Sequence, residues 1–151
     1  NKLPIYAVDI KKTYVFLKRY NINLTNFVFD LILATYVYNP SLANSDLRLI
    51  YNEFIDAQIP YLEEVFPKKG DIDINVIANY SVTKVSFLKE VKEVIDKKLK
   101  EYNQLKLLYQ MEIPLSLVLA EMERSGFKIN ISHLNEIGIE LQKFTQNGQS
   151  S

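Results

Sequence analysis

Two short apolar runs, separated by an amphipathic segment, place the strongest constraint on the fold of this chain. Residues 5–8 suit a buried strand, and apolar side chains then recur at near-helical spacing over residues 10–20. Residues 27–29 form a second apolar run, followed by a predicted buried helix over residues 31–38 that ends before Pro40. Two strands joined by one helix make a βαβ unit, so the pattern predicts parallel pairing in an α/β layer.

The middle of the chain is predicted to be mainly helical. A helix is expected over residues 46–54, with Ser45 or Asp46 as its N-cap. A Lys-Lys-Gly-Asp turn at residues 68–71 marks a loop, and residues 74–109 then follow a helical pattern. The apolar face of this long segment is expected to comprise Val85, Leu88, Val91, Ile95, Leu99, Tyr102 and Leu105.

A proline and a glycine bracket the next predicted helix. Pro114 disfavours helical geometry at Ile113 and lacks an N–H donor, so the preceding helix should stop or kink near Glu112. A new helix should then start at Pro114 and end before Gly126, which suits the left-handed position after a helix. Its inward-facing apolar stripe is expected to comprise Leu115, Val118, Leu119 and Met122.

A last helix is expected from Asn130, whose side chain can cap it. His133, the only histidine of the chain, falls in its first turn without cysteine or acidic partners at metal-ligand spacing, so we expect it on an exposed helix surface. The apolar face of this helix is expected to comprise Leu134, Ile137, Leu141 and Phe144.

Composition limits the class of protein. With 151 residues, 48% of them hydrophobic, the chain is long enough for one core but short for two complete domains. Eighteen basic and eighteen acidic residues balance, so any nucleic-acid contact must be local rather than driven by a global positive field. The absence of cysteine excludes disulfides, thiolate zinc sites and thiol nucleophiles.

The longest apolar run, residues 27–38, is interrupted by Asp30 and falls short of the roughly 20 residues that a membrane span needs. The sequence therefore predicts a soluble protein without a membrane partner. The chain begins Asn-Lys-Leu-Pro, with neither an initiator methionine nor the pattern of a signal peptide, which favours a fragment of a longer protein.

Two stretches resemble the family A DNA polymerases, the family of bacterial DNA polymerase I. EIPLSLVLAEMERSGFKINISHL, residues 112–134, is similar to the family pattern Glu-x-Pro-Leu, Val-Leu and Met-Glu-x-x-Gly at the start of the polymerase domain. FVFDLILATYVYNP, residues 27–40, is similar to the Phe-Asp, Leu-Ala-x-Tyr and Asn-Pro pattern of the preceding 3′–5′ exonuclease-like domain. The looser similarity extends over nearly the whole chain.

The resemblance implies an α/β fold: a truncated RNase H-like exonuclease domain with a short mixed or parallel sheet over residues 1–104, then α-helices of the polymerase domain over residues 105–151, leading into the thumb. It also implies an intact enzyme that extends primer–template DNA with dNTPs and Mg²⁺. That enzyme would be a monomer in the bacterial cytoplasm, or alternatively in an organelle. The piece itself would be catalytically silent, without a cofactor of its own.

The resemblance also implies which residues belonged to a proofreading site. In the family, carboxylates hold two metals for phosphodiester cleavage. Asp9 matches the acid at the strand-to-helix junction, and Tyr80 matches the tyrosine of a later Tyr-x-x-x-Asp motif, but Lys84 stands where its acid should be. A cation there would repel Mg²⁺, and the family's Asp-x-Glu strand is not in this chain, so an inactive exonuclease-like domain is expected.

The candidate residues also have simpler, structural interpretations. Asp9 and Asp30 both suit helix caps, and Tyr80 suits a packing role with a hydrogen-bonded hydroxyl. Two other functions also stay open from the sequence: an active 3′–5′ exonuclease whose missing carboxylates lie upstream, and a non-enzymatic helical interaction module unrelated to nucleic acids.

Overall fold

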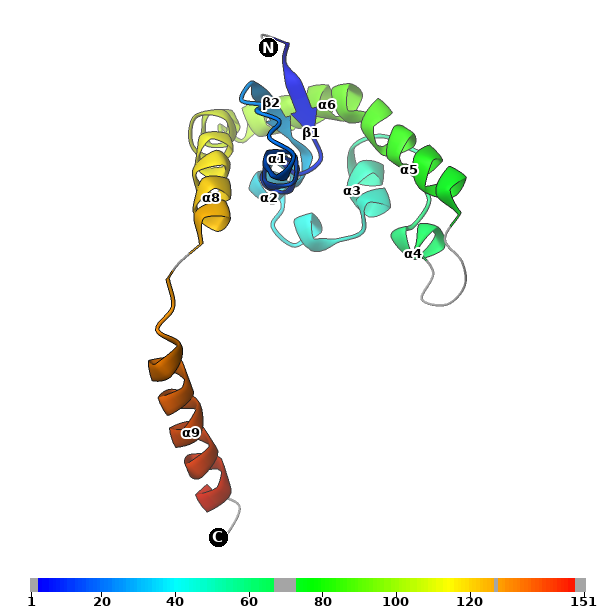
Figure 1. Cartoon of the computed structure of the whole chain (residues 1–151). Helices are drawn as coiled ribbons and strands as arrows, with labels where there is room; N and C mark the ends of the chain where they lie inside the picture. The colour runs from blue at the N-terminus through cyan, green and yellow to red at the C-terminus, as the bar shows by residue number, and fades with distance from the viewer. Residues whose placement is uncertain (1–2, 67–72, 127, 149–151) are drawn as a thin grey trace.

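A computed structural model describes residues 3–66, 73–126 and 128–148, with side chains described as far as residue 142. The predicted turn at residues 68–71 and the side chain of Phe144 therefore lie outside the described residues. Figure 1 shows a body of helices around two short strands, with one helix extending from it. In the described part of the chain, no helix combines the length and the apolar character needed to cross a membrane.

The predicted βαβ unit is confirmed. Strand β1 (Ile5–Ala7) leads through helix α1 (Ile10–Arg19) to strand β2 (Phe27–Asp30), and the two strands pair in parallel. Tyr6 lies opposite Phe29, and Ala7 lies opposite Asp30. Both strands therefore end at the same edge of the sheet, where α1 and α2 begin.

Helices α2 (Leu31–Tyr38) and α3 (Leu47–Phe54) also form as predicted, separated by a short 3₁₀ turn at Leu42–Asn44. Asp46 is the N-cap of α3, and its side chain accepts a hydrogen bond from the Arg48 backbone N–H at 2.8 Å.

The helical segment from residue 74 is divided into two helices. After the short α4 (Leu62–Val65), α5 (Ile74–Ser86) ends at Phe87, where α6 (Leu88–Glu101) begins. The face of α6 is buried at Leu88, Val91, Ile95 and Leu99, as predicted. The expectation for Val85 and Tyr102 was wrong: they are 51% and 63% exposed, because Val85 lies on a separate helix and Tyr102 lies in the turn after α6.

One core joins these elements. Helix α2 packs against α6, and α3 also contacts α6. The largest fully buried side chains come from β2, from α1, α2, α3, α4 and α6, from the loop before α4 and from residue 108: Tyr51, Phe29, Ile10, Leu31, Ile50, Ile59, Ile95, Leu99, Leu108, Val65, Val91 and Thr35.

The helix break expected near Glu112 does not occur. After α7 (Leu105–Leu107), residues Leu108–Glu112 form a π-helical turn that continues directly into α8 (Ile113–Ser125). Glu112 and Ile113 keep right-handed helical angles, with φ of −65° and −63°. The wider π turn precedes Pro114, whose missing donor and bulky ring would strain a regular α-helical turn. The chain instead breaks at the turn after α6, where Asn103 has φ of 57°.

The predicted inward stripe of α8 is also wrong. Leu115, Val118, Leu119 and Met122 are 45–56% exposed, and the buried positions of α8 are Ile113, Ser116 and Ala120. Helix α8 packs along α1. The small side chains of Ser116 and Ala120 face the body, and the four residues of the apolar stripe lie on the more exposed sides of α8.

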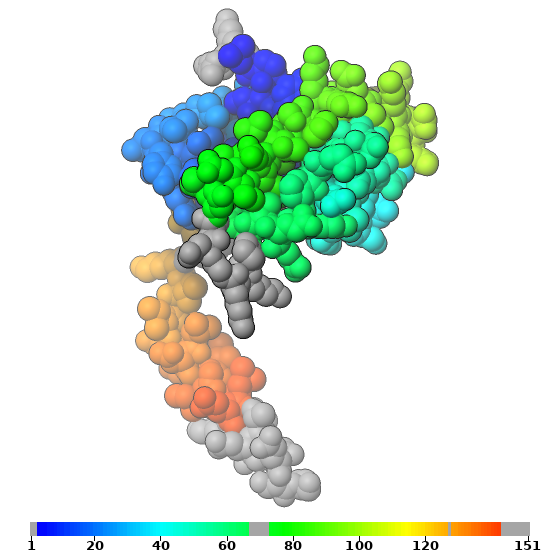
Figure 2. All heavy atoms as spheres, turned by 90° about the vertical axis from the view of Figure 1, so that its right-hand side faces the viewer, coloured from blue at the N-terminus to red at the C-terminus, as the bar shows by residue number. Residues whose placement is uncertain are grey.

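Helix α9 (Ile131–Gly148) begins at the predicted cap: the His133 backbone N–H donates to the Asn130 side chain at 3.2 Å. His133 is exposed, as predicted, and its ring lies 3.4 Å from the Glu136 carboxylate. Every residue from 131 to 142 is exposed. In Figures 1 and 2, α9 projects away from the rest of the molecule.

Gly126 takes a backbone conformation that favours glycine. It follows α8 with φ of 67° and ψ of −178°, and its N–H donates to the Met122 carbonyl at 3.0 Å. A Cβ at this position would have no atom within 4 Å, so the cost of a side chain here is conformational rather than a clash.

Gly126→Val is therefore expected to lower the free energy of unfolding by about 1–2 kcal/mol in urea titrations. The matched control is Gly138→Ala, within α9, where a Cβ also meets open space and helix propensity should give a gain of up to about 1 kcal/mol. An unchanged unfolding midpoint in Gly126→Val would contradict the expected strain.

Candidate functional site

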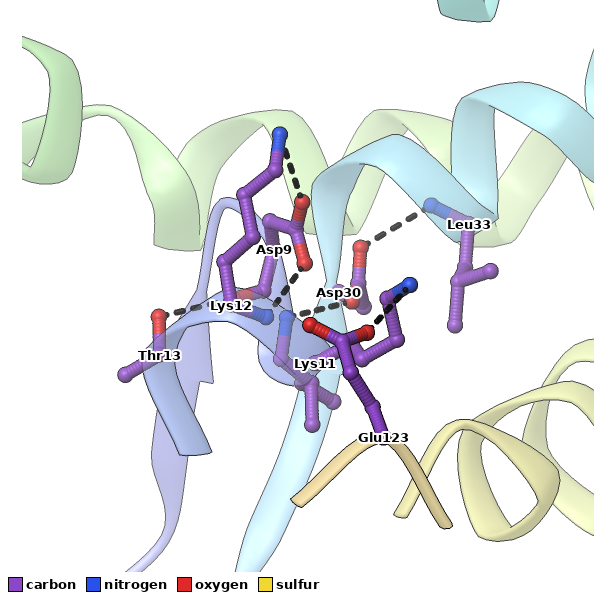
Figure 3. A network of polar contacts seen from close by, with 8 residues as sticks. Asp9, Lys11, Lys12, Thr13, Asp30, Leu33 and Glu123 are labelled. Carbon is purple, nitrogen blue, oxygen red and sulfur yellow. Dashed lines mark hydrogen bonds and ion pairs between the residues drawn. The ribbon is translucent and has the colours of Figure 1, made fainter. Parts of the chain in front are cut away.

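Asp9 lies at the carboxyl end of β1 and caps α1. Its side chain accepts a hydrogen bond from the Lys12 backbone N–H at 2.9 Å, and its other oxygen lies 3.3 Å from the Lys12 ammonium. The Thr13 hydroxyl donates to the Asp9 carbonyl oxygen at 2.7 Å (Figure 3). The carboxylate is therefore engaged at the helix N-terminus, as the simpler sequence interpretation expected.

Asp30 lies beside Asp9, at the end of β2, and joins two helices. One of its oxygens accepts a hydrogen bond from the Leu33 backbone N–H at 2.9 Å, which caps α2 as predicted. The other accepts from the Ile10 backbone N–H of α1 at 2.7 Å (Figure 3). This second bond was not predicted, because it spans 20 residues. The available signal was the parallel pairing itself, which brings both strand ends together.

The Asp30 residue is 2% exposed. Burial raises the pKa of its carboxyl group to about 6, against the lowering effect of the hydrogen bonds from Ile10 and Leu33, and the negative charge of Asp9 adds to the rise. The group can therefore change its charge near pH 6, well above the usual range of an aspartate.

Helix α8 lies over this edge of the sheet. The Lys11 ammonium on α1 and the Glu123 carboxylate on α8 are 3.0 Å apart, and Figure 3 shows both beside Asp30. A cavity of about 230 Å³ lies at the same edge, lined by Asp9, Lys11, Asp30, Ile32, Leu33, Ser116 and Leu119.

Tyr80 and Lys84 lie elsewhere, on α5. Tyr80 is 5% exposed, and burial raises its pKa, with a further contribution from the charge of Asp46. The Lys84 ammonium lies 5.4 Å from the centre of the Tyr80 ring, a cation–π distance. The Tyr51 hydroxyl donates to the Lys84 carbonyl oxygen, which ties α3 to α5.

The structure brings Tyr80 and Lys84 together but not with Asp9. Both line a cavity of about 300 Å³ with Asp46 and residues of α3 and α4, and this cavity shares no residue with the one at Asp9. Across residues 3–66, 73–126 and 128–148, no three histidine, cysteine or acidic side chains gather in a group that could hold a metal ion. The roles of Asp9, Tyr80 and Lys84 in a vestigial exonuclease site remain predictions.

Glu121 of α8 is the centre of the contact with α1. It accepts a hydrogen bond from the Tyr14 hydroxyl, lies 3.6 Å from the Lys18 ammonium, and pairs with Arg124 at 2.8 Å. The hydrogen bonds from Tyr14 and Arg124 lower the pKa of Glu121 to about 2. No local sequence pattern predicted these contacts of Glu121, because Tyr14 and Glu121 are 107 residues apart in the sequence.

Tyr14→Phe removes one hydroxyl and keeps the ring. Since Tyr14 is largely buried and its partner is ionised, we expect the free energy of unfolding to fall by about 1 kcal/mol in urea titrations. Tyr20→Phe is the control, because Tyr20 is 65% exposed, and it should leave stability unchanged. If Tyr14→Phe is as stable as Tyr20→Phe, the hydrogen bond from Tyr14 to Glu121 does not stabilise the packing of α8 on α1.

Comparison with known proteins gives one consistent result. The family model for the ribonuclease H-like domain of DNA polymerase I matches residues 1–91. DNA polymerase I of Bacillus subtilis (strain 168) is 27% identical over 90% of this chain. DNA polymerase I of Lactococcus lactis subsp. cremoris is 33% identical over 92%, and that of Streptococcus pneumoniae serotype 4 is 31% identical over 96%. The matched segments are 16–17% of the length of these relatives.

Proposed function

The chain belongs to the ribonuclease H-like domain family of DNA polymerase I, and from this premise we propose that it is a segment of a DNA-directed DNA polymerase that acts in replication and repair. The βαβ unit and the family match support this proposal. The alternative of an unrelated helical interaction module is disfavoured by the family match and by the sheet strand that leads into Asp9.

The parent protein would act as a monomer and transfer nucleotides from dNTPs to the 3′ end of a DNA primer. When bound, Mg²⁺ would supply charge neutralisation and Lewis-acid activation for such a transfer. The carboxylates at the sheet edge of this segment do not suit that ion, because Asp9 and Asp30 already accept hydrogen bonds from helix N-termini. The polymerase metal site would therefore belong to the rest of the parent protein.

We further propose that this segment does not proofread. By the resemblance, Lys84 stands where the family has a metal-binding acid, and its ammonium lies 5.4 Å from the centre of the Tyr80 ring. Asp9 is paired with Lys12. A cation at one ligand position opposes binding of a divalent metal, so two-metal cleavage of a mismatched 3′ end would not be supported. The active-exonuclease alternative requires carboxylates from outside this segment.

The segment would instead act as a scaffold, with residues 1–104 as the exonuclease-like domain and residues 105–151 as the first helices of the polymerase domain. The observation that carries this proposal is the docking of α8 on α1. Glu121 contacts Tyr14 and Lys18, and Glu123 pairs with Lys11. These contacts hold α8 along α1.

Primer extension by the full-length parent protein tests the proposal. With a paired primer–template, dNTPs and Mg²⁺, the parent should extend the primer to the end of the template. Failure of the purified, folded parent to extend any primer would overturn the polymerase assignment.

A further inference from the structure

The cavity of about 300 Å³ that holds Tyr80 and Lys84 lies between the start of α3, the short α4 and the second half of α5. Figure 1 shows these three helices on the same side of the molecule. A volume of this size is at the lower end of the range for small-molecule sites. The scaffold role proposed above makes no use of this cavity.

The hydroxyl group of Tyr80 is the first feature that points to a ligand. Tyr80 is 5% exposed, yet its hydroxyl forms no hydrogen bond with any residue in the described part of the chain. The oxygen is not sealed from solvent, because every fully buried side-chain oxygen or nitrogen in that part has a hydrogen-bond partner. Burial raises the pKa of Tyr80, so the hydroxyl stays protonated. It is therefore a donor without an acceptor in the wall of the cavity.

The cavity also carries one charge of each sign. The Lys84 ammonium comes from α5 and the Asp46 carboxylate from the start of α3, and neither forms an ion pair with any of the described residues. Asp46 accepts hydrogen bonds from the N–H groups of Arg48, at 2.8 Å, and Leu62, at 3.2 Å. A carboxylate offers about four acceptor sites, so Asp46 can accept further hydrogen bonds.

The rest of the lining supplies hydroxyl groups and an apolar wall. Ser45 and Ser81 add two hydroxyls, and Leu47, Leu62 and Phe66 add apolar surface. Leu62 and Phe66 are 48% and 41% exposed, so the core does not cover them. The cavity therefore combines a cation, an anion, hydroxyl donors and an apolar wall.

We propose that this cavity binds a free α-amino acid with an apolar side chain. The ligand carboxylate accepts hydrogen bonds from the Lys84 ammonium and the Tyr80 hydroxyl, and the ligand ammonium donates to Asp46. The ligand side chain packs on Leu62 and Phe66. Asp46 would repel a purely anionic ligand, and Lys84 would repel a purely cationic one, whereas a zwitterion is attracted at both ends. The inference does not depend on polymerase activity.

Calorimetric titration of the full-length parent with three related ligands tests the proposal. L-phenylalanine carries both charges, 3-phenylpropionate lacks the ammonium, and 2-phenylethylamine lacks the carboxylate. L-phenylalanine should bind with a Kd below about 1 mM, and each analogue should bind at least about tenfold more weakly.

Variants of the parent locate the binding. Lys84→Met should weaken the binding of L-phenylalanine at least about tenfold and should not weaken that of 2-phenylethylamine. Tyr80→Phe keeps the ring and should weaken the binding of L-phenylalanine about fivefold. The matched control is Lys97→Met on α6, an exposed lysine outside the cavity, and it should bind as the wild type does. Urea titration of each variant checks that it is folded.

Absence of saturable binding, equal affinity for the three ligands, or equal behaviour of Lys84→Met and Lys97→Met would overturn the proposal. Tighter binding of a deoxynucleoside monophosphate than of L-phenylalanine, lost in Lys84→Met, would assign the cavity to a nucleotide and would also overturn it.

Discussion

At pH 4, Asp30→Ala is expected to lower the free energy of unfolding by about 3 kcal/mol. Its carboxyl group is the acceptor for the buried Ile10 N–H of α1, at 2.7 Å, and for the partly buried Leu33 N–H of α2, at 2.9 Å. Leaving a buried donor without its partner costs about 1–3 kcal/mol each. At this pH the group is mostly neutral in the folded protein, so alanine removes hydrogen bonds without relieving a buried charge.

Asp9→Ala is the matched control for this measurement. Asp9 also caps a helix at the same sheet edge, but it is less buried and its side chain accepts a single backbone hydrogen bond, from Lys12. Its replacement should cost about 1 kcal/mol. Equal losses for the two variants in urea titrations would show that Asp30 acts as an ordinary cap and does not join α1 to α2.

The second large effect is a loss of stability as the pH rises. The pKa of Asp30 is about 6 in the folded protein, above its ordinary value of 3.8, so the folded state holds this proton more tightly than the unfolded state does. The contribution is fully present below pH 3.8 and is lost as the pH rises through about 6. Between about pH 4 and pH 7, ionisation of Asp30 should reduce the free energy of unfolding by about 2 kcal/mol.

The comparison of wild type with Asp30→Asn isolates this effect, because asparagine is similar in shape and does not titrate. Urea titrations at intervals of about one pH unit from pH 4 to pH 7 should show the stability of the wild type falling relative to the variant, most steeply at about pH 5, midway between the two pKa values, and levelling off above about pH 6. A constant difference across the series would contradict the effect of burial on the pKa of Asp30.

Local patterns predicted the part of the fold that depends on neighbouring residues. The two apolar runs before Asp9 and Asp30 predicted both strands, and the helix over Leu31–Tyr38 forms with the expected bounds. Asp46 and Asn130 cap helices as predicted, and Gly126 has positive φ. Each of these features follows from side chains within about four residues of the position concerned.

The errors concern which side of a helix finds a partner. Leu115 and Met122 follow the spacing of a buried stripe, but spacing cannot tell whether that stripe meets the same domain. Here, Tyr14 and Lys18 of α1 contact Glu121, so the side of α8 that carries Glu121 packs against α1. The break expected near Glu112 does not form, because a π-helical turn over Leu108–Glu112 accommodates the proline that follows it.

The candidate site was only partly accessible from the sequence. The motifs in residues 27–40 and 112–134 indicated the family that the comparisons then identified. The cap role of Asp30 was predicted, but its bond to Ile10 depends on strand pairing, and the contacts of Glu121 depend on tertiary packing. The proposed loss of proofreading rests on Lys84 and Asp9, whose correspondence to the family motif stays a prediction.

The most direct test of the account is a degradation assay with the full-length parent on a mismatched primer, with Mg²⁺ and without dNTPs. If the exonuclease-like domain is inactive, the primer will keep its length over times in which the same preparation extends a paired primer completely, and Asp9→Ala will behave identically. Shortening of the primer from its 3′ end by the wild type, abolished in Asp9→Ala, would contradict the account.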